Sequence, residues 1–196
     1  MQNPFIKMHG LGNDFIILDH RDDTLPLTPK RIQSLSHRRF GIGCDQLIVL
    51  EPTTHPKADV FMRIYNPNGL EAGACGNATR CLGSLLSEEF KRPGCTIETV
   101  SGTLTTFLRS DGLVDVNMGE PRLDWQDIPL SKECDTLHLP IKKGVLSDPV
   151  AVNMGNPHMV FFVEDVQGID IHNLGRQLTS HDLYPEQANI EFVEVL

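Results

Sequence analysis

Short runs of apolar residues, many alternating with polar ones, fill the first part of the chain and predict β-strands. The runs are bounded by Gly, Pro, Asn and Asp and lie close together, which favours antiparallel pairing. Ser101-Gly102 and Asp111-Gly112 are hairpin signals between such runs. The predicted strands are Phe5–His9, Asp14–Asp19, Leu47–Glu51, Asp59–Tyr65, Thr96–Val100, Thr103–Leu108 and Leu113–Asn117.

Two helices are predicted among these strands. The first has Thr28 as its N-cap and Pro29 at its first position, and we expect it to run to about Arg39. The second spans Asn77–Phe90, where apolar residues recur at helical spacing. Because its remaining positions carry little bulk, Gly83 among them, we expect the strands to enclose this helix.

The composition becomes rich in turn residues after Asn117, and a domain boundary is predicted near Met118. The predicted domains are residues 1–118 and residues 119–196. In the second domain the pattern predicts strands, then a helix, then a last strand. These elements are the strands Thr136–Ile141, Val145–Asn153 and Met159–Val163, the helix Asp170–His181 and the strand Asn189–Leu196.

An internal repeat relates the two domains. In the first, a turn at Asn13 leads into an apolar strand, a helix and a strand headed by Gln46. In the second, a turn at Asn156 leads into the same series and a strand headed by Asn189. Both pairs are 33 positions apart, and the copies are offset by 143 residues. A duplicated unit of strands and helices explains this order.

Composition narrows the class of protein. The 196 residues, 40% of them hydrophobic, indicate a globular domain, and the net charge of −9 argues against nucleic-acid binding. No apolar run is long enough to span a membrane and no secretory leader is recognised, so we expect a cytoplasmic protein. The five cysteines form no Cys-x-x-Cys pair and the eight histidines no metal-binding pattern, so we expect neither disulfides nor a metal site.

Cys75 is the strongest candidate for chemistry. It follows a strand and a Pro/Gly-rich loop and stands immediately before the second predicted helix. Free N–H groups and the positive end of the helix dipole lie there, so we expect a lowered pKa and thiolate character for Cys75. The alternative is a small buried hydrophobic residue, the expectation that we hold for Cys81.

Four ordered motifs make the chain similar to the diaminopimelate epimerase family. They extend over most of the chain, which makes the resemblance specific. The motifs are residues 7–15 (KMHGLGNDF), 39–46 (RFGIGCDQ), 74–81 (ACGNATRC) and 154–158 (MGNPH).

The resemblance implies an isomerase that interconverts LL- and meso-diaminopimelate without pyridoxal phosphate or another cofactor. It implies an α+β fold of two pseudo-symmetric halves, each a mostly antiparallel mixed sheet wrapped around a central helix, with substrate in the cleft between them. A cysteine from each half faces one side of the α-carbon in this family. Two thiols suit the reaction because opposite faces must lose and gain a proton.

The resemblance assigns a role to each matching residue. Cys75 is one acid/base, and Gly76 and Asn77 hold the α-carboxylate. His158 lies next to the reacting centre, where it orients or tunes the thiols, although it could equally be structural. The amides at substrate-contacting positions, which could otherwise cap turns, are Asn13, Gln46, Asn66, Asn156 and Asn189.

One departure from the family affects the expected activity. Applied to Cys75, the repeat offset predicts the partner cysteine near position 218, beyond Leu196. We therefore expect a C-terminally truncated chain with an incomplete second half, inactive alone and able to form a homodimer or pair with a separate fragment. Two alternatives remain open: a related two-thiol racemase or isomerase of this fold acting on another amino acid, and a non-catalytic ligand-binding half-enzyme.

Overall fold

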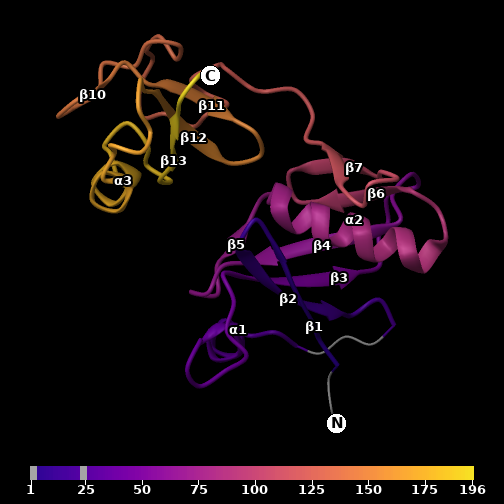
Figure 1. Ribbon diagram of the computed structural model, residues 1–196. Helices are drawn as coiled ribbons and strands as arrows, with labels where there is room; N and C mark the ends of the chain where they lie inside the picture. The colour runs from indigo at the N-terminus through magenta and orange to yellow at the C-terminus, as the bar shows by residue number, and fades with distance from the viewer. Residues whose placement is uncertain (1–3, 23–25) are drawn as a thin grey trace. The chain divides into compact units, whose positions relative to one another are not determined.

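The computed structural model describes residues 4–22 and 26–196, and the chain divides into two compact units, Met1–Met118 and Gly119–Leu196 (Figure 1). Unit 1 contains β1 (Ile6–Gly10), β2 (Asn13–Asp19), α1 (Pro29–Ser36), β3 (Gln46–Glu51), β4 (Val60–Tyr65), β5 (Glu71–Ala72), α2 (Gly76–Phe90), β6 (Gly94–Thr99), β7 (Gly102–Leu108) and β8 (Val114–Asn117). Unit 2 contains β9 (Lys142–Lys143), β10 (Leu146–Ser147), β11 (Val150–Asn153), β12 (Pro157–Phe162), α3 (Ile171–Thr179) and β13 (Asn189–Val193).

The strands of unit 1 form one mixed sheet in the order β1-β2-β3-β4-β6-β7-β8, with β5 paired to β4. Most neighbouring pairs are antiparallel, while β2–β3 and β4–β6 are parallel. Both parallel pairs are joined by a crossover that contains a helix, as such connections require. The α+β fold class with a mostly antiparallel mixed sheet is confirmed.

Helix α2 packs against strands from both ends of the sheet, namely β1 at one edge and β6, β7 and β8 towards the other. A sheet can contact one helix with strands from both of its edges only if the sheet curls around that helix. Ala78, Leu82 and Leu86 of α2 are buried against inward-facing strand residues such as Phe15 and Ile64. The predicted enclosure of this helix by the strands is confirmed.

The opposite face of β2 and β3 is covered by α1. Ile32 of α1 packs with Ile16, Leu18, Leu47 and Val49, so these two strands are buried on both faces. That burial explains their almost uninterrupted apolar sequences.

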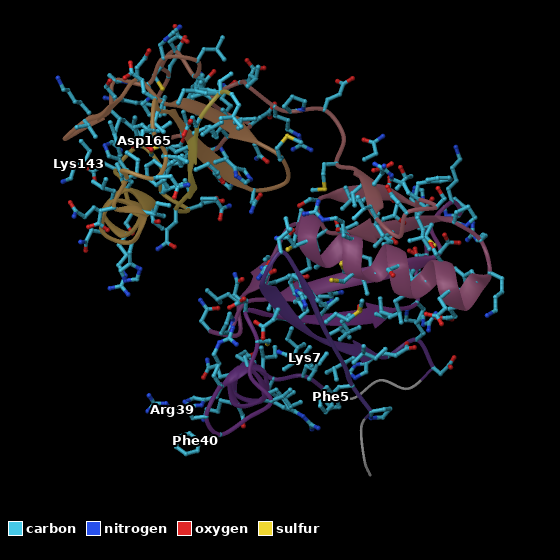
Figure 2. All side chains as sticks on the ribbon, in the orientation of Figure 1. Phe5, Lys7, Arg39, Phe40, Lys143 and Asp165 are labelled. Carbon is cyan, nitrogen blue, oxygen red and sulfur yellow. The ribbon has the colours of Figure 1, made fainter. Side chains whose placement is uncertain are left out.

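Helix α1 ends at Ser36, three residues before the predicted end. The turn that follows satisfies its last carbonyl groups, since Ile42 N–H donates to Leu35 O at 2.9 Å. Arg39 and Phe40 project from this turn, and the Phe40 side chain is 88% exposed (Figure 2).

Unit 2 has a three-stranded sheet, β11-β12-β13, with α3 packed against β13. Asp170 caps α3 through a hydrogen bond from Asn173 N–H at 3.2 Å, and the helix ends at Thr179 rather than the predicted His181. Buried Met159 and Phe161 of β12 and Leu178 of α3 belong to its core.

The repeat has a structural counterpart in strand pairing. In unit 1 the parallel pair β2–β3 aligns Phe15 with Gln46, and in unit 2 the parallel pair β12–β13 aligns His158 with Asn189. The two registers are related by the same offset of 143 residues. Each parallel pair also follows an antiparallel one, β1–β2 or β11–β12.

The predicted strand Thr136–Ile141 is wrong, and Val145–Asn153 is broken into β10 and β11. Pro140 has no N–H to donate to a neighbouring strand, and Asp148 adopts a left-handed conformation (φ 55°) before Pro149. The alternation of apolar and polar residues that predicted a strand at Thr136–Ile141 arises because Leu139 and Ile141 are both buried in the core of unit 2.

Gly83 tests the close contact between α2 and the sheet. A Cβ there would lie 2.8 Å from Thr106 Cβ and 2.9 Å from Val114 Cγ1. We predict that Gly83→Ala lowers the free energy of unfolding by about 1–3 kcal/mol through overpacking, measured by urea denaturation. Gly175→Ala in α3 is the control: its Cβ would meet nothing within 4 Å, so helix propensity should stabilise the protein by roughly 0.5–1 kcal/mol. Equal effects would contradict the enclosure of α2.

Candidate active site

The turn between β1 and β2 lies against the first residues of α2. Leu11 and Gly12 form this two-residue hairpin turn, and both have positive φ angles, 54° and 87°. A Cβ on Gly10 would lie 3.2 Å from the backbone oxygen of Asn77. Glycine at this position therefore allows the hairpin and the start of the helix to approach each other closely.

Cys75 is the N-cap of α2, as its position before the periodic segment indicates. Its Sγ accepts a hydrogen bond from Ala78 N–H at 3.5 Å, and its backbone oxygen accepts from Thr79 Oγ1 at 2.8 Å. On the other side, Sγ lies 3.7 Å from Oδ1 of Asn13. The thiol is half-buried and lies between the helix and the β1–β2 hairpin.

The expected low pKa of Cys75 is wrong for the protein without substrate. Burial raises the pKa of the thiol above its ordinary value, and the hydrogen bonds from Ala78 and Asn77 N–H and the charge of Arg80 compensate only in part. The free-energy cost of removing a thiolate from water is larger than the stabilisation that one helix N-terminus provides. Cys75 is therefore present as a thiol near neutral pH.

Asn13, at the first position of β2, is hydrogen-bonded to residues at the start of α2 and just before β3. Its Oδ1 faces Cys75 Sγ and, at 3.5 Å, Nδ2 of Asn77. Its own Nδ2 donates to Oδ2 of Asp45 at 3.3 Å. These contacts join the start of β2, the start of α2 and the segment leading into β3.

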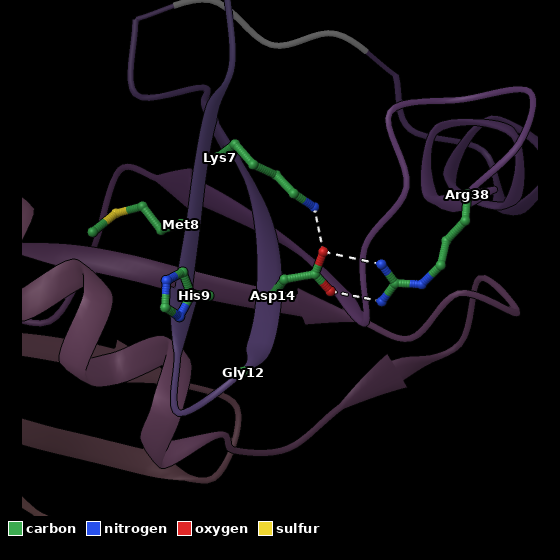
Figure 3. A pocket seen from close by; sticks show the side chains of 6 residues that line it. All are labelled: Lys7, Met8, His9, Gly12, Asp14 and Arg38. Atoms are coloured by element: carbon green, nitrogen blue, oxygen red, sulfur yellow. Dashed lines mark hydrogen bonds and ion pairs between the residues drawn. The ribbon is translucent and has the colours of Figure 1, made fainter.

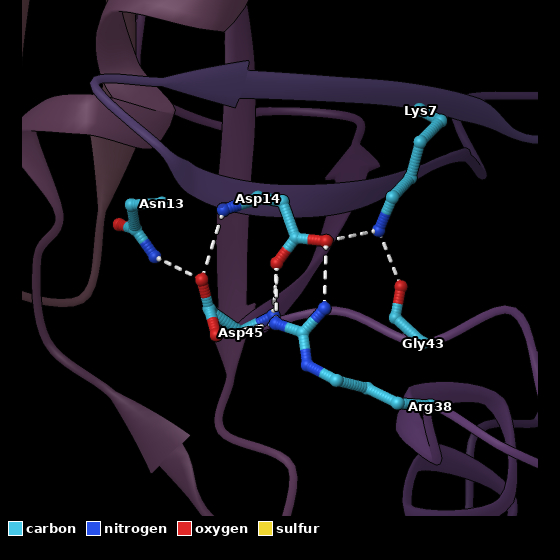
Figure 4. Close-up of polar contacts among 6 residues, drawn as sticks. All are labelled: Lys7, Asn13, Asp14, Arg38, Gly43 and Asp45. Atoms are coloured by element: carbon cyan, nitrogen blue, oxygen red, sulfur yellow. Dashed lines mark hydrogen bonds and ion pairs between the residues drawn. The ribbon is translucent and has the colours of Figure 1, made fainter.

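An ion network holds the beginnings of β2 and β3 together (Figure 4). Asp14 N–H donates to Asp45 Oδ2 at 3.0 Å, and Asp45 N–H donates to Asp14 Oδ1 at 2.9 Å. Arg38 binds both carboxylates, at 2.7 Å for Asp14 and 2.6 Å for Asp45. Lys7 binds Asp14 at 2.7 Å and also donates to Gly43 O.

The same network forms part of a pocket on unit 1 (Figure 3). The pocket is lined by Lys7, Met8, His9, Gly12, Asp14 and Arg38. Hydrogen bonds from Arg38 and Lys7 hold the pKa of Asp14 well below its usual range. Because Lys7 and Arg38 are both paired with Asp14, they do not form a free anion site.

Gln46 and Asn66 form a second polar pair in unit 1. Gln46 opens β3 and Asn66 follows β4, and Gln46 Nε2 donates to Asn66 Oδ1 at 3.1 Å. Gln46 Oε1 is buried and has no hydrogen-bond partner in the described part of the chain. A buried amide oxygen without a partner is costly, so a ligand donor there would be favoured.

In unit 2 the structure brings Asn156 and His158 together with Glu191. The His158 ring lies between Glu191, 2.6 Å from Nδ1, and Asn156 Oδ1, 2.8 Å from Nε2. The backbone oxygen of His158 accepts a hydrogen bond from Tyr184 Oη at 3.1 Å. Asn189 aligns with His158 across the parallel ladder, and its Nδ2 donates to Pro157 O at 3.3 Å. These contacts fix the orientation of the imidazole.

Several of these residues were not singled out from the sequence. Asp14, Arg38 and Asp45 lie within or beside the quoted motifs, but their pairing crosses up to 31 residues and has no local signal. Glu191 did have a local signal in the sequence. It lies two residues after Asn189 in a predicted strand, so both side chains are on the same face of that strand. Cys81 is buried in the core, as expected.

Residues 4–22 and 26–196 contain neither a metal-binding cluster nor a membrane-spanning helix. No three His, Cys, Asp or Glu side chains gather there in a way that could hold a metal ion. No helix in those ranges has the length and apolar character needed to cross a membrane.

The pH dependence of stability tests the ion network. Because the pKa of Asp14 is lowered on folding, its contribution is fully present above its ordinary pKa and is lost as the pH falls towards the folded value. We predict that Asp14→Asn lowers the free energy of unfolding at neutral pH by about 1 kcal/mol and flattens its fall below about pH 4. Asp115→Asn, whose carboxylate is largely exposed, is the control. An unchanged acid limb in Asp14→Asn would contradict the assignment.

Comparison with known proteins identifies the family of the chain. The family model described as diaminopimelate epimerase matches residues 5–123 and 150–196. A diaminopimelate epimerase of Rhodospirillum centenum is 52% identical over the whole chain, which covers 67% of that relative. One from Acidiphilium cryptum is 45% identical, covering 98% of the chain and 69% of the relative. A Bacillus anthracis phenazine biosynthesis protein of the PhzF family shares the fold, with a TM-score of 0.60 and 19% identity, covering all of this chain and 68% of that structure. The chain belongs to the diaminopimelate epimerase family.

Proposed function

We propose that Cys75 is one of two acid/base groups in the cofactor-independent epimerisation of LL- and meso-diaminopimelate. The observation that carries this proposal is a half-buried thiol at the N-terminus of α2, facing Asn13 across 3.7 Å. The N–H groups of Ala78 and Asn77 approach the sulfur there, and a substrate bound at this end of the helix would bring its α-carbon beside the sulfur.

The substrate's α-carboxylate is proposed to bind at the first turn of α2. The first N–H groups of a helix have no partners within it, and Gly76 and Asn77 supply two of them. A Cβ on Gly76 would meet only Met118 atoms, the nearest at 3.5 Å, so the approach to its backbone is open. Negative charge that develops on the carboxylate as the α-carbon loses its proton would be stabilised there.

The amide side chains suit the substrate's amino group. Gln46 Oε1 is a buried acceptor without a partner in the described residues, and it could accept a hydrogen bond from an ammonium group. We propose substrate contacts for the amides Asn13, Gln46 and Asn66 in unit 1 and Asn156 and Asn189 in unit 2. His158 is proposed to lie next to the reacting centre, where it orients or tunes the thiols.

The proton balance requires a second thiol. In one direction a thiolate removes the α-proton, the C–H electron pair passes towards the carboxylate, and Cys75 S–H donates its proton to the opposite face. In the reverse direction Cys75 is the base. One thiol fixed on one face cannot complete this exchange efficiently, because the incoming proton must come from the other side.

A polypeptide of these 196 residues is therefore predicted not to epimerise diaminopimelate, because the partner cysteine expected near position 218 is not among them. The measurement is incubation with LL-diaminopimelate in deuterated water, followed by chiral separation and mass spectrometry. Formation of deuterated meso isomer above the protein-free background would contradict this prediction.

Covalent labelling separates an enzyme site from a simple binding module. We predict that an aziridine analogue of diaminopimelate alkylates Cys75, since its ring would be opened by the sulfur beside the α-carbon. Cys134, another half-buried free thiol, is the internal control and should not react. Absence of labelling, with tight binding of diaminopimelate that survives Cys75→Ser, would favour the ligand-binding module. Preference for an analogue of another amino acid would favour a related racemase.

The remaining parts of the proposal are a cytoplasmic location and a homodimer. Cell fractionation tests the first. Light scattering on the purified chain tests the second, with a mass of twice 21.9 kDa expected for a dimer.

A further inference from the structure

The Asn13 amide lies between the sulfur of Cys75 and the carboxylate of Asp45. Its Nδ2 is 3.3 Å from Asp45 Oδ2, and its Oδ1 is 3.7 Å from Cys75 Sγ. The oxygen and the nitrogen of an amide are opposite in hydrogen-bonding character. Which of them faces the sulfur therefore decides whether the amide favours a thiol or a thiolate.

The neighbours fix this orientation at both ends. A carboxylate only accepts hydrogen bonds, so Asp45 requires Nδ2 of Asn13 on its side. At the other end the Arg80 guanidinium, which only donates, binds Asn77 Oδ1 and thereby turns Nδ2 of Asn77 towards Asn13. The donors therefore all point one way, from Arg80 through Asn77 and Asn13 to Asp45.

The sulfur lies beside the oxygen end of Asn13. An oxygen there accepts a hydrogen bond from S–H, whereas it would repel the lone pairs of a thiolate. We propose that Asp45 is a positioning residue that fixes the Asn13 amide with its oxygen towards Cys75 and so holds Cys75 in its protonated form until substrate binds. This inference rests on the proposed acid/base role of Cys75 for its meaning in catalysis.

Asp45 is itself held in place. Its Oδ2 accepts Asp14 N–H at 3.0 Å in addition to the Asn13 amide, and its Oδ1 binds Arg38 at 2.6 Å. The ion network thus connects an exposed arginine to the orientation of an amide in the candidate active site. Asp45 does not contact the sulfur and acts through Asn13.

Other groups also influence the thiol. The positive charge of Arg80 lowers the pKa of Cys75, and so do the N–H groups of Ala78 and Asn77, while burial raises it. Cys81, six residues further along the chain, interacts electrostatically with Cys75. A variant of Asp45 leaves all of these groups unchanged.

The experiment measures the rate at which iodoacetamide alkylates Cys75, followed by peptide mass spectrometry from about pH 6 to about pH 10, because only the thiolate reacts. Asp45→Asn removes the restraint at one end of the Asn13 amide, because the new amide can donate as well as accept hydrogen bonds. Asn13 can then exchange its contact with Asn77 for an orientation in which its Nδ2 faces the sulfur. We expect the alkylation profile to shift to lower pH and the rate at neutral pH to rise by about threefold to tenfold, as a fall of half to one pKa unit implies.

Asp59→Asn is the matched control. Asp59 also binds an arginine, Arg92, and accepts a backbone N–H, that of Thr96 at 2.8 Å. This variant removes an equivalent ion pair that has no contact with Asn13, and its alkylation profile should match the wild type.

A double-mutant cycle with Asn13→Ala separates positioning from a direct charge effect. If Asp45 acts through the amide, Asn13→Ala alone raises the rate, and adding Asp45→Asn raises it no further. An unchanged alkylation rate in Asp45→Asn would overturn the proposal. The proposal would also be overturned if Asp45→Asn raised the rate equally in the wild-type and Asn13→Ala backgrounds, because the carboxylate charge would then act directly on the sulfur. If Asp45→Asn does not fold, an unchanged rate in Asn13→Ala overturns it. Alkylation needs no substrate, so these outcomes are independent of aziridine labelling, which tests the acid/base role.

Discussion

Packing of α2 inside the curled sheet of unit 1 is the constraint on which the candidate site depends. The helix contacts β1 near one edge and β8 at the other, so its position is fixed along its length. Gly83 permits the close approach to β7 and β8, and Leu82 and Leu86 fill the space against the central strands. With the helix fixed, its N-terminus meets the β1–β2 hairpin, and Cys75 lies beside Asn13.

The ion network matters more for geometry than for stability. Water screens exposed ion pairs, so Arg38, whose side chain is more than half exposed, adds little to the free energy of folding. The reciprocal hydrogen bonds between Asp14 and Asp45 instead align the starts of two parallel strands. Because Asn13 and Gln46 lie at those starts, the network sets the places of two of the amides assigned to substrate binding.

Burial gives Cys75 a different resting state from the one that helix position alone suggests. The helix N-terminus attracts negative charge, but the surrounding protein removes water from the sulfur, and burial has the larger effect on the pKa. A resting thiol is compatible with an acid/base pair, because one member must carry the proton that it will donate. The arrival of a positively charged amino group would then favour ionisation.

Periodicity and turn residues were enough to predict most strands of unit 1 and the enclosed helix, because each strand there lies in a continuous ladder with one clear pattern. They failed at Thr136–Ile141, where buried Leu139 and Ile141 alternate in a loop that Pro140 keeps out of any ladder. In the candidate site, Cys75, Asn13, Gln46 and Asn156 were found because they stand at element ends within motifs, whereas Asn66 and Asn189 lie outside the four motifs. Asp45 and Arg38 make their decisive contacts with Asp14, which is distant in sequence, so they required the folded arrangement. The rise in the pKa of Cys75 depends on burial, which no local motif encodes.

The polarity of the hydrogen-bond chain from Arg80 to Asp45 decides whether Asn13 favours a thiol or a thiolate at Cys75. Neutron diffraction from a crystal of the deuterium-exchanged protein at neutral pH would show this polarity, because deuterium positions distinguish amide oxygen from nitrogen. We expect both deuterons of the Asn13 amide on its Asp45 side and a deuteron on Cys75 Sγ directed at Asn13 Oδ1. An Asn13 amide with its nitrogen towards a bare sulfur would contradict this expectation.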